Sequence, residues 1–175
     1  MLFRSAEAEQ RCAAINRICW SEEQQAYVDT PRDEWAYRQY QALCREKGWT
    51  VLPWETYRGC LRVSEQTNTL AALCDCVPPE RMAPVRQIIR RVERGDFRSS
   101  SPAGRSMGPP PEQEAPGGIV SIGSPFFLFF TLGALFHVGD GRLALDVMRR
   151  EWGKMADMGF RTCPELFGWT RRDRK

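Results

Sequence analysis

Apolar residues recur along this chain at intervals of three and four, in segments bounded by capping and turn residues. This spacing predicts helices over Glu7–Cys19 and Asp33–Lys47, and a third helix after Ser64. Ser64 and the Ser124-Pro125 pair are residue types that begin helices, because Ser caps the first turn and Pro fits its first position. We therefore expect a nearly all-helical fold.

Three further helices complete the expected set. One begins at Pro78-Pro79 and closes at Gly95, one spans Pro125–His137, and the last begins at an Asp140 cap and ends at Gly159. On the exposed side of the last helix we expect an ion pair between Asp146 and Arg150. The inward positions that we predict are Tyr37, Tyr40 and Leu43 on the second helix, Val63, Thr67, Leu70, Ala71 and Cys74 on the third, Met82, Val85, Ile88, Ile89 and Val92 on the fourth, and Leu145, Met148, Trp152 and Met155 on the sixth.

The fifth helix raises the question of a membrane. Ile119–Val138 contains no Asp, Glu, Lys or Arg, and its length is close to the roughly 20 residues that a spanning helix needs. The Ser124-Pro125 start shortens the helix to Pro125–His137, which favours a core helix covered by its neighbours. Consecutive helix pairs of this kind indicate stacked helix hairpins, and a membrane anchor remains an alternative.

The segment from Ser99 to Gly118 is rich in Ser, Pro and Gly, and we expect an irregular loop there. The helices on both sides have the same character. We therefore expect one domain, residues 1–175, with an internal loop at 99–118.

Composition excludes several functions. The net charge of +3 comes from Lys and Arg residues that are spread along the chain and matched by acids, which does not indicate a nucleic-acid binder. Seven cysteines without regular spacing and one histidine, His137, make a structural metal site improbable, and we expect no cofactor. We interpret the cysteines as free thiols in a reducing compartment, the cytoplasm. His137 is expected to stabilise the terminal carbonyls of its helix.

The residues alone offer few candidates for chemistry. Glu165 follows Pro164 just past the last helix and precedes Phe167 and Trp169, so its carboxylate lies among rings that could stack on a sugar. An exposed loop glutamate with no catalytic role fits the same pattern. Gln66 and Asn68 carry amides that could bond sugar hydroxyls or only the backbone.

Two longer segments combine these features. Val63–Ile89 contains Ser-Glu-Gln-Thr-Asn-Thr-Leu-Ala, and Ser124–Phe167 contains Ser-Pro-Phe-Phe followed by Trp-Gly-Lys-Met. In order and spacing they resemble the C-terminal half of the catalytic domain of bacterial α-L-rhamnosidases, and Tyr27-Val28-Asp29 resembles that family's lead-in. The resemblance extends from about Cys19 to Trp169.

The resemblance implies a fold and a reaction. It implies part of an α/α toroid of six helix hairpins, and hydrolysis of terminal α-L-rhamnosyl groups with inversion, with a rhamnose-containing carbohydrate as partner. An inverting enzyme needs an acid and a base on either side of the sugar. The family's base is the glutamate after its Gly-x-x-Thr segment, so the resemblance assigns this role to Glu165. Trp169, Gln66 and Asn68 are the expected substrate-binding residues.

The chain also departs from the family. The acidic, Trp-rich segment that carries the general acid has no counterpart, the sequence past Trp169 differs, and Gly133 stands where the family often has a glutamate. We therefore expect an incomplete toroid that has little or no activity on its own and that self-associates through uncovered helix faces. A non-catalytic helical scaffold that binds a partner is the alternative hypothesis.

Overall fold

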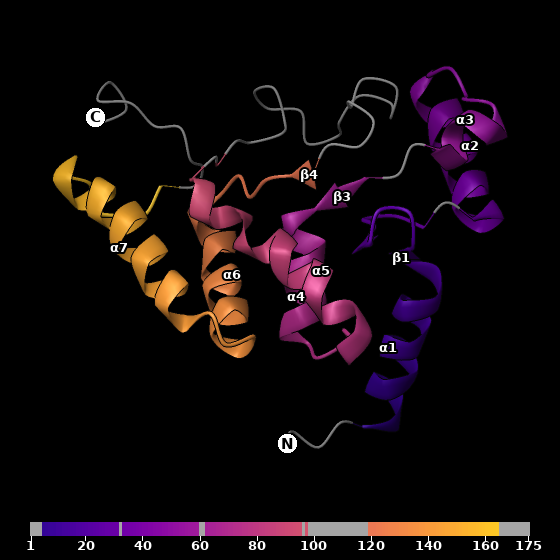
Figure 1. The fold of residues 1–175 in the computed structure, drawn as a ribbon. Coiled ribbons are helices and arrows are strands. Elements are labelled where there is room, and N and C mark those ends of the chain that lie inside the picture. Colours follow the sequence, from indigo (N-terminus) through magenta and orange to yellow (C-terminus); the bar gives the residue numbers. More distant parts are fainter. Residues whose placement is uncertain (1–4, 32, 60–61, 96, 98–118, 165–175) are drawn as a thin grey trace.

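Helices make up most of the structure, a computed structural model that describes residues 5–31, 33–59, 62–95, 97 and 119–164. The predicted all-α class is confirmed (Figure 1). The elements in chain order are α1 (Ala6–Ile18), β1 (Trp20–Ser21), β2 (Ala26–Tyr27), α2 (Glu34–Lys47), α3 (Trp54–Gly59), β3 (Val63–Ser64), α4 (Glu65–Leu73), α5 (Pro79–Ile89), the 3-10 helix η1 (Arg90–Arg94), β4 (Ile119–Val120), α6 (Pro125–His137) and α7 (Gly141–Asp157).

The caps confirm most of the predicted helix boundaries. The Ser64 hydroxyl accepts from the Thr67 N–H at 3.1 Å at the start of α4, and the Ser124 hydroxyl accepts from the Phe127 N–H at 3.2 Å at the start of α6. Gly48 ends α2 with a φ of 67°, a left-handed conformation that favours glycine. These boundaries follow from local residue chemistry, and sequence reasoning finds them for that reason.

Two hairpins, α4–α5 and α6–α7, pack side by side around the main core. α6 lies between α4 and α7, while α1 and the α2–α3 pair lie on the far side of α4 from α7 (Figure 1). The most deeply buried members of this core come from all four helices and from the segment before α6. They include Val85, Ile89, Ile122, Leu128, Leu135 and Val147.

Sequence patterns did not indicate α3 or the short strands. Tyr57 of α3 is 1% exposed, and its ring lies 5.0 Å from that of Tyr37 and 4.8 Å from that of Tyr40, so packing against α2 defines this helix. β1 pairs with β2 in antiparallel fashion, and β3 pairs with β4 in parallel. The second pairing joins segments more than fifty residues apart, which no local pattern reveals.

The predicted inward stripe of α4 is wrong in part. Ala71 is buried as expected, but Leu70 and Cys74 are exposed. Polar side chains, Asn68 and Thr69, occupy the inward positions instead, each at 0% exposure. A buried polar side chain needs partners, and these come from other parts of the chain.

The buried face of α7 also differs from the predicted one. Leu145 and Met148 were predicted to point inward, but each is more than a third exposed. Met155 is buried as predicted, and the other buried positions, Ala144, Val147 and Glu151, each lie one residue before a predicted one. On α2, the predicted Leu43 is likewise exposed, while Ala36 and Cys44 are buried.

One face of α6 is exposed, although α4 and α7 pack on its two flanks. Leu128 and Leu135 are fully buried, whereas Phe126, Phe129 and Phe136 are 73%, 68% and 53% exposed. The prediction that neighbours cover this helix all round is therefore wrong for the described residues. Within that part of the chain, none of the helices combines the length and the apolar character needed to cross a membrane.

Asp140 precedes α7 as predicted, but its carboxylate does not cap the helix. It accepts from the Arg86 Nε at 2.7 Å and from the Arg90 guanidinium at 2.6 Å, both on the neighbouring hairpin. The hydrogen bond from Arg86 is the main cause that lowers the pKa of Asp140 below its ordinary value. Asp140 therefore holds the start of α7 against the end of α5.

The predicted pair of Asp146 and Arg150 is absent. Asp146 pairs with Arg149 at 3.3 Å. Arg150 turns to the buried Glu151 and donates to the Val92 carbonyl at 2.8 Å. These contacts tie α7 to the end of η1.

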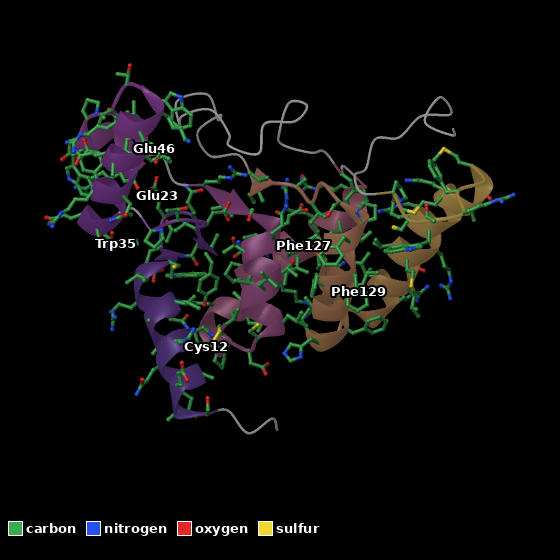
Figure 2. All side chains as sticks on the ribbon, turned by 180° about the vertical axis from the view of Figure 1, so that it is seen from behind. Cys12, Glu23, Trp35, Glu46, Phe127 and Phe129 are labelled. Atoms are coloured by element: carbon green, nitrogen blue, oxygen red, sulfur yellow. A yellow bond between two sulfur atoms is a disulfide. The ribbon has the colours of Figure 1, made fainter. Side chains whose placement is uncertain are left out.

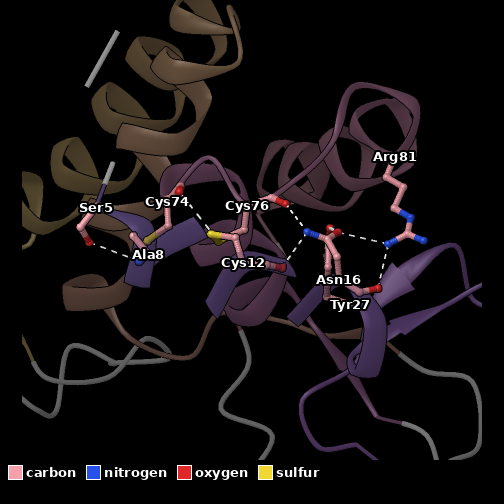
Figure 3. Close-up of a disulfide and its surroundings, with 8 residues drawn as sticks. All are labelled: Ser5, Ala8, Cys12, Asn16, Tyr27, Cys74, Cys76 and Arg81. Carbon is pink, nitrogen blue, oxygen red and sulfur yellow. Dashed lines mark hydrogen bonds between the residues drawn. A yellow bond between two sulfur atoms is a disulfide. The ribbon is translucent and has the colours of Figure 1, made fainter. Parts of the chain in front are cut away.

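A disulfide between Cys12 and Cys76 corrects the expectation of seven free thiols (Figure 3). It joins α1 to the turn between α4 and α5. The Asn16 side-chain amide, one helical turn along α1, donates to the Cys76 carbonyl at 2.6 Å and to the Cys12 carbonyl at 2.9 Å. The bond also removes the basis of the argument for a reducing compartment, because such bonds persist mainly in oxidising ones.

We predict that this disulfide is a main anchor of α1, none of whose residues is buried. Its partners are 64 residues apart, so opening it with Cys12→Ser should lower the free energy of unfolding by about 4 kcal/mol. Urea unfolding followed by circular dichroism measures this. Cys163→Ser, at an exposed thiol, is the control and should change stability by less than about 0.5 kcal/mol. Equal stability of the two variants would contradict the prediction.

Candidate functional site

The candidate site lies at the end of the molecule where α4 and α6 begin. β3 and β4 lead into these helices and pair at Val63 with Ile119, so the two helix starts are held together. α6 and α7 are antiparallel and joined by a short turn, and α7 leans away from α6 as it runs back toward the end of the molecule where α6 begins (Figure 1). The described chain reaches Pro164, one residue before Glu165.

Glu65 anchors this end of the fold. It is 2% exposed, accepts from the Ile122 N–H at 2.9 Å, and lies 3.1 Å from the Nε of Arg91. Burial raises the pKa of the Glu65 carboxyl, while the Ile122 N–H and the charge of Arg91 oppose that change. One carboxylate thus links α4, η1 and the segment before α6. Sequence reasoning missed it, because its partners are remote.

Gln66, also at the start of α4, has a side-chain amide whose hydrogen bonds are only partly made within the described residues. Its Nε2 lies 3.5 Å from the Ser121 carbonyl, at the outer limit of a hydrogen bond. Its Oε1 is buried and has no hydrogen-bond partner among the described residues. A buried oxygen without a partner is unusual, so this amide is a candidate for a ligand contact.

Asn68, the other predicted substrate-binding amide, is engaged elsewhere. It is 0% exposed, its Oδ1 accepts from the Tyr27 N–H at 3.0 Å, and its Nδ2 donates to the Tyr27 carbonyl at 3.0 Å. The same nitrogen donates to the Ser64 carbonyl at 2.9 Å. These bonds fasten β2 to α4 and leave the amide with a structural role.

A second carboxylate, Asp29, lies beside the start of α4. Its Oδ1 accepts from the hydroxyls of Ser64 and Thr67, both at 2.5 Å, and its Oδ2 lies 3.1 Å from the Nε of Arg62. Asp29 therefore orients the cap of α4. One signal in the sequence points to it, since Asp29 belongs to the Tyr27-Val28-Asp29 lead-in of the family resemblance.

His137 lies at the other end of α6, away from these residues. Its Nε2 is 2.6 Å from the Asp75 carboxylate at the end of α4. The predicted contact with terminal carbonyls is thus replaced by a bridge between two helices. This is a link in the fold and does not bring His137 to the candidate site.

Two predicted site residues, Glu165 and Trp169, lie outside the described residues. Among the described residues there is no group of three His, Cys, Asp or Glu side chains that could hold a metal ion.

Comparison with known proteins gives one relevant likeness. No family model and no curated protein matches the chain. The structure is similar to the crystal structure of a GH78 family rhamnosidase of Bacillus sp. GL1, with a TM-score of 0.56 and 26% sequence identity over 93% of this chain. The fold is therefore glycoside-hydrolase-like. The chain spans only 12% of the length of that rhamnosidase chain.

We predict that Glu65 makes stability depend on pH. Its folded-state pKa is raised above the ordinary 4.5, so its contribution is fully present below pH 4.5 and is lost as pH rises through the folded-state pKa. Glu65→Gln removes this titration. The stability of the wild type relative to the variant should fall as pH rises above 4.5. Urea unfolding at each pH measures the difference, and a constant or rising difference would refute the assignment.

We also predict that Asn68→Ala destabilises the fold by about 3 kcal/mol, because the buried Tyr27 N–H and carbonyl lose their partner. Gln66→Ala, on the same helix, is the control and should cost less than about 1 kcal/mol, since its amide makes one long contact. Thermal unfolding of both variants tests this. If Asn68→Ala leaves stability unchanged, its structural role is wrong.

Proposed function

We propose that this chain forms part of an α-L-rhamnosidase-type glycoside hydrolase and supplies its general base, Glu165. The observation that carries the proposal is the structural likeness to a rhamnosidase over nearly the whole chain. The family resemblance of Ser124–Phe167 is consistent with it. The substrate class is a carbohydrate with a terminal α-L-rhamnosyl group.

The described geometry supports this placement of the site. α7 runs back toward the end of the bundle that also holds Gln66, whose Oε1 lacks a partner among the described residues. In the proposal, Gln66 and Trp169 bind the sugar, and Glu165 removes a proton from the water that attacks the anomeric carbon. Asn68 is not assigned a sugar contact, because the backbone uses its amide.

Two described carboxylates beside this end, Glu65 and Asp29, do not offer a general acid. Glu65 is held by Arg91 and the Ile122 N–H, and Asp29 is held by two hydroxyls and Arg62. Proton transfer to the leaving oxygen supplies typically a hundred- to ten-thousand-fold in rate. The isolated chain should therefore cleave natural rhamnosides poorly or not at all.

A substrate that needs no acid tests the role of Glu165 directly. We expect slow turnover of 2,4-dinitrophenyl α-L-rhamnoside, whose leaving group departs without protonation, and no turnover of an alkyl rhamnoside. Glu165→Gln should reduce the dinitrophenyl rate by at least about a hundredfold. Added azide should restore turnover in that variant and give the azide of inverted configuration.

The control is Glu80→Gln, an exposed glutamate at the start of α5, which should keep the wild-type rate. Dinitrophenyl turnover that is equal in the wild type and Glu165→Gln, or a product of retained configuration, would contradict the proposal.

The second candidate function is a non-catalytic helical scaffold. The observation that favours it is the uncovered aromatic side of α6, where Phe126, Phe129 and Phe136 are exposed. An apolar surface of this kind marks a binding site for another protein.

A further inference from the structure

Exposed apolar side chains gather on one face that crosses three helices. Phe126, Phe129 and Phe136 lie on the same side of α6 and carry most of it. Phe130 joins two of these rings, with centroid distances of 5.5 Å to Phe126 and 5.6 Å to Phe129. We call the exposed side chains of this region the aromatic face; its members are Leu70, Phe126, Phe129, Phe136, Leu145 and Met148.

The neighbouring helices extend this face on both sides. α4 lies next to α6 at Gly133, where an added Cβ would be 3.7 Å from Leu73. Leu70 precedes Leu73 by three residues, so the exposed Leu70 lies on the same side of α4. A Cβ at Gly141 would meet the Phe136 ring at 2.9 Å, which places the first turn of α7 at the other flank. Leu145 follows Gly141 by four residues and so continues the same stripe.

The shape of the face is self-complementary. Phe129 forms a ridge. Gly133, one helical turn further along α6, has no side chain, and only Leu73 lies within 4 Å of the position that a Cβ would occupy there. A second α6 that runs antiparallel across the first can place its Phe129 over this gap while its own Gly133 receives the other ring. Ridges that fit into grooves are the usual basis of helix packing, and a two-fold axis repeats the fit at both positions.

The available area is enough for a specific contact. At 150–250 Å² for a buried aromatic side chain, the three exposed rings offer roughly 400 Å², and the flanking side chains raise this to roughly 600 Å². Two copies then bury about 1,200 Å² in total, the lower bound of stable interfaces. α6 has no Asp, Glu, Lys or Arg to oppose the approach of a second copy.

We propose that the aromatic face binds a second copy of this chain, with α6 packed antiparallel on α6 and Phe129 of each copy seated over Gly133 of the other. This inference does not rest on the glycosidase proposal, because it uses only the exposed surface.

Sedimentation velocity across a range of concentrations tests the contact. The wild type should sediment as a reversible dimer. Phe129→Glu should raise the dissociation constant at least tenfold, because the contact would bury a charge. Trp35→Glu is the matched control: Trp35 is 70% exposed but lies on α2, away from α6 (Figure 2), and its loss should leave the dimer intact. Circular dichroism confirms that each variant is folded.

Gly133→Leu separates a fitted contact from general stickiness. The variant adds apolar surface and favours the helix, so non-specific association would strengthen. In the proposed contact the new side chain fills the gap, and the dimer should weaken at least tenfold. A photoreactive phenylalanine analogue at position 129 should also cross-link two copies, while one at position 35 should not.

A wild-type chain that stays monomeric at all concentrations would overturn the proposal. So would association without a limiting size, or a dimer that Gly133→Leu strengthens. A monomer that binds lipid vesicles through the same face would also overturn it, and would assign the face to a membrane surface.

Discussion

The fold depends on α6, a helix without acidic residues, Lys or Arg that must be shielded from water. α4 covers one flank and α7 the other, and the fully buried Leu128 and Leu135 belong to the largest core cluster. The tight turn after His137 returns α7 alongside α6, and Asp140 fixes that return through Arg86 and Arg90. Once this pair of helices is formed, α7 runs back toward the end of the molecule where α6 begins (Figure 1).

The candidate site is held by buried polar contacts. Glu65 joins α4 to Arg91 and to the Ile122 N–H, and Asn68 joins α4 to β2. Removing one partner from such a contact leaves a buried group without a bond, which costs more than the bond itself contributes. The start of α4, and with it Gln66, is therefore positioned by contacts that tolerate little change.

The sequence predicted helix boundaries well and buried faces less well. Helix boundaries depend on residues close in sequence, such as the Ser64 and Ser124 hydroxyls that cap the first turns of α4 and α6, so a local pattern reveals them. Buried faces on α4 and α7 were misassigned, because Asn68 and Glu151 are buried and their partners are not evident from apolar spacing. The Cys12–Cys76 pairing could not be chosen among seven cysteines without the fold.

For the candidate site, the sequence predicted that Gln66 lies near the start of α4, which the structure shows. It did not indicate that the Asn68 amide bonds the backbone, or that Asp29 orients the helix cap. The assignment of Glu165 as the base rests on the family resemblance and on the structural likeness to a rhamnosidase.

A crystal structure of the chain with L-rhamnose tests this account most directly. It predicts the sugar at the end where α4 and α6 begin, in contact with Gln66 and Glu165. Rhamnose bound at another part of the surface, with Glu165 turned away, would contradict it.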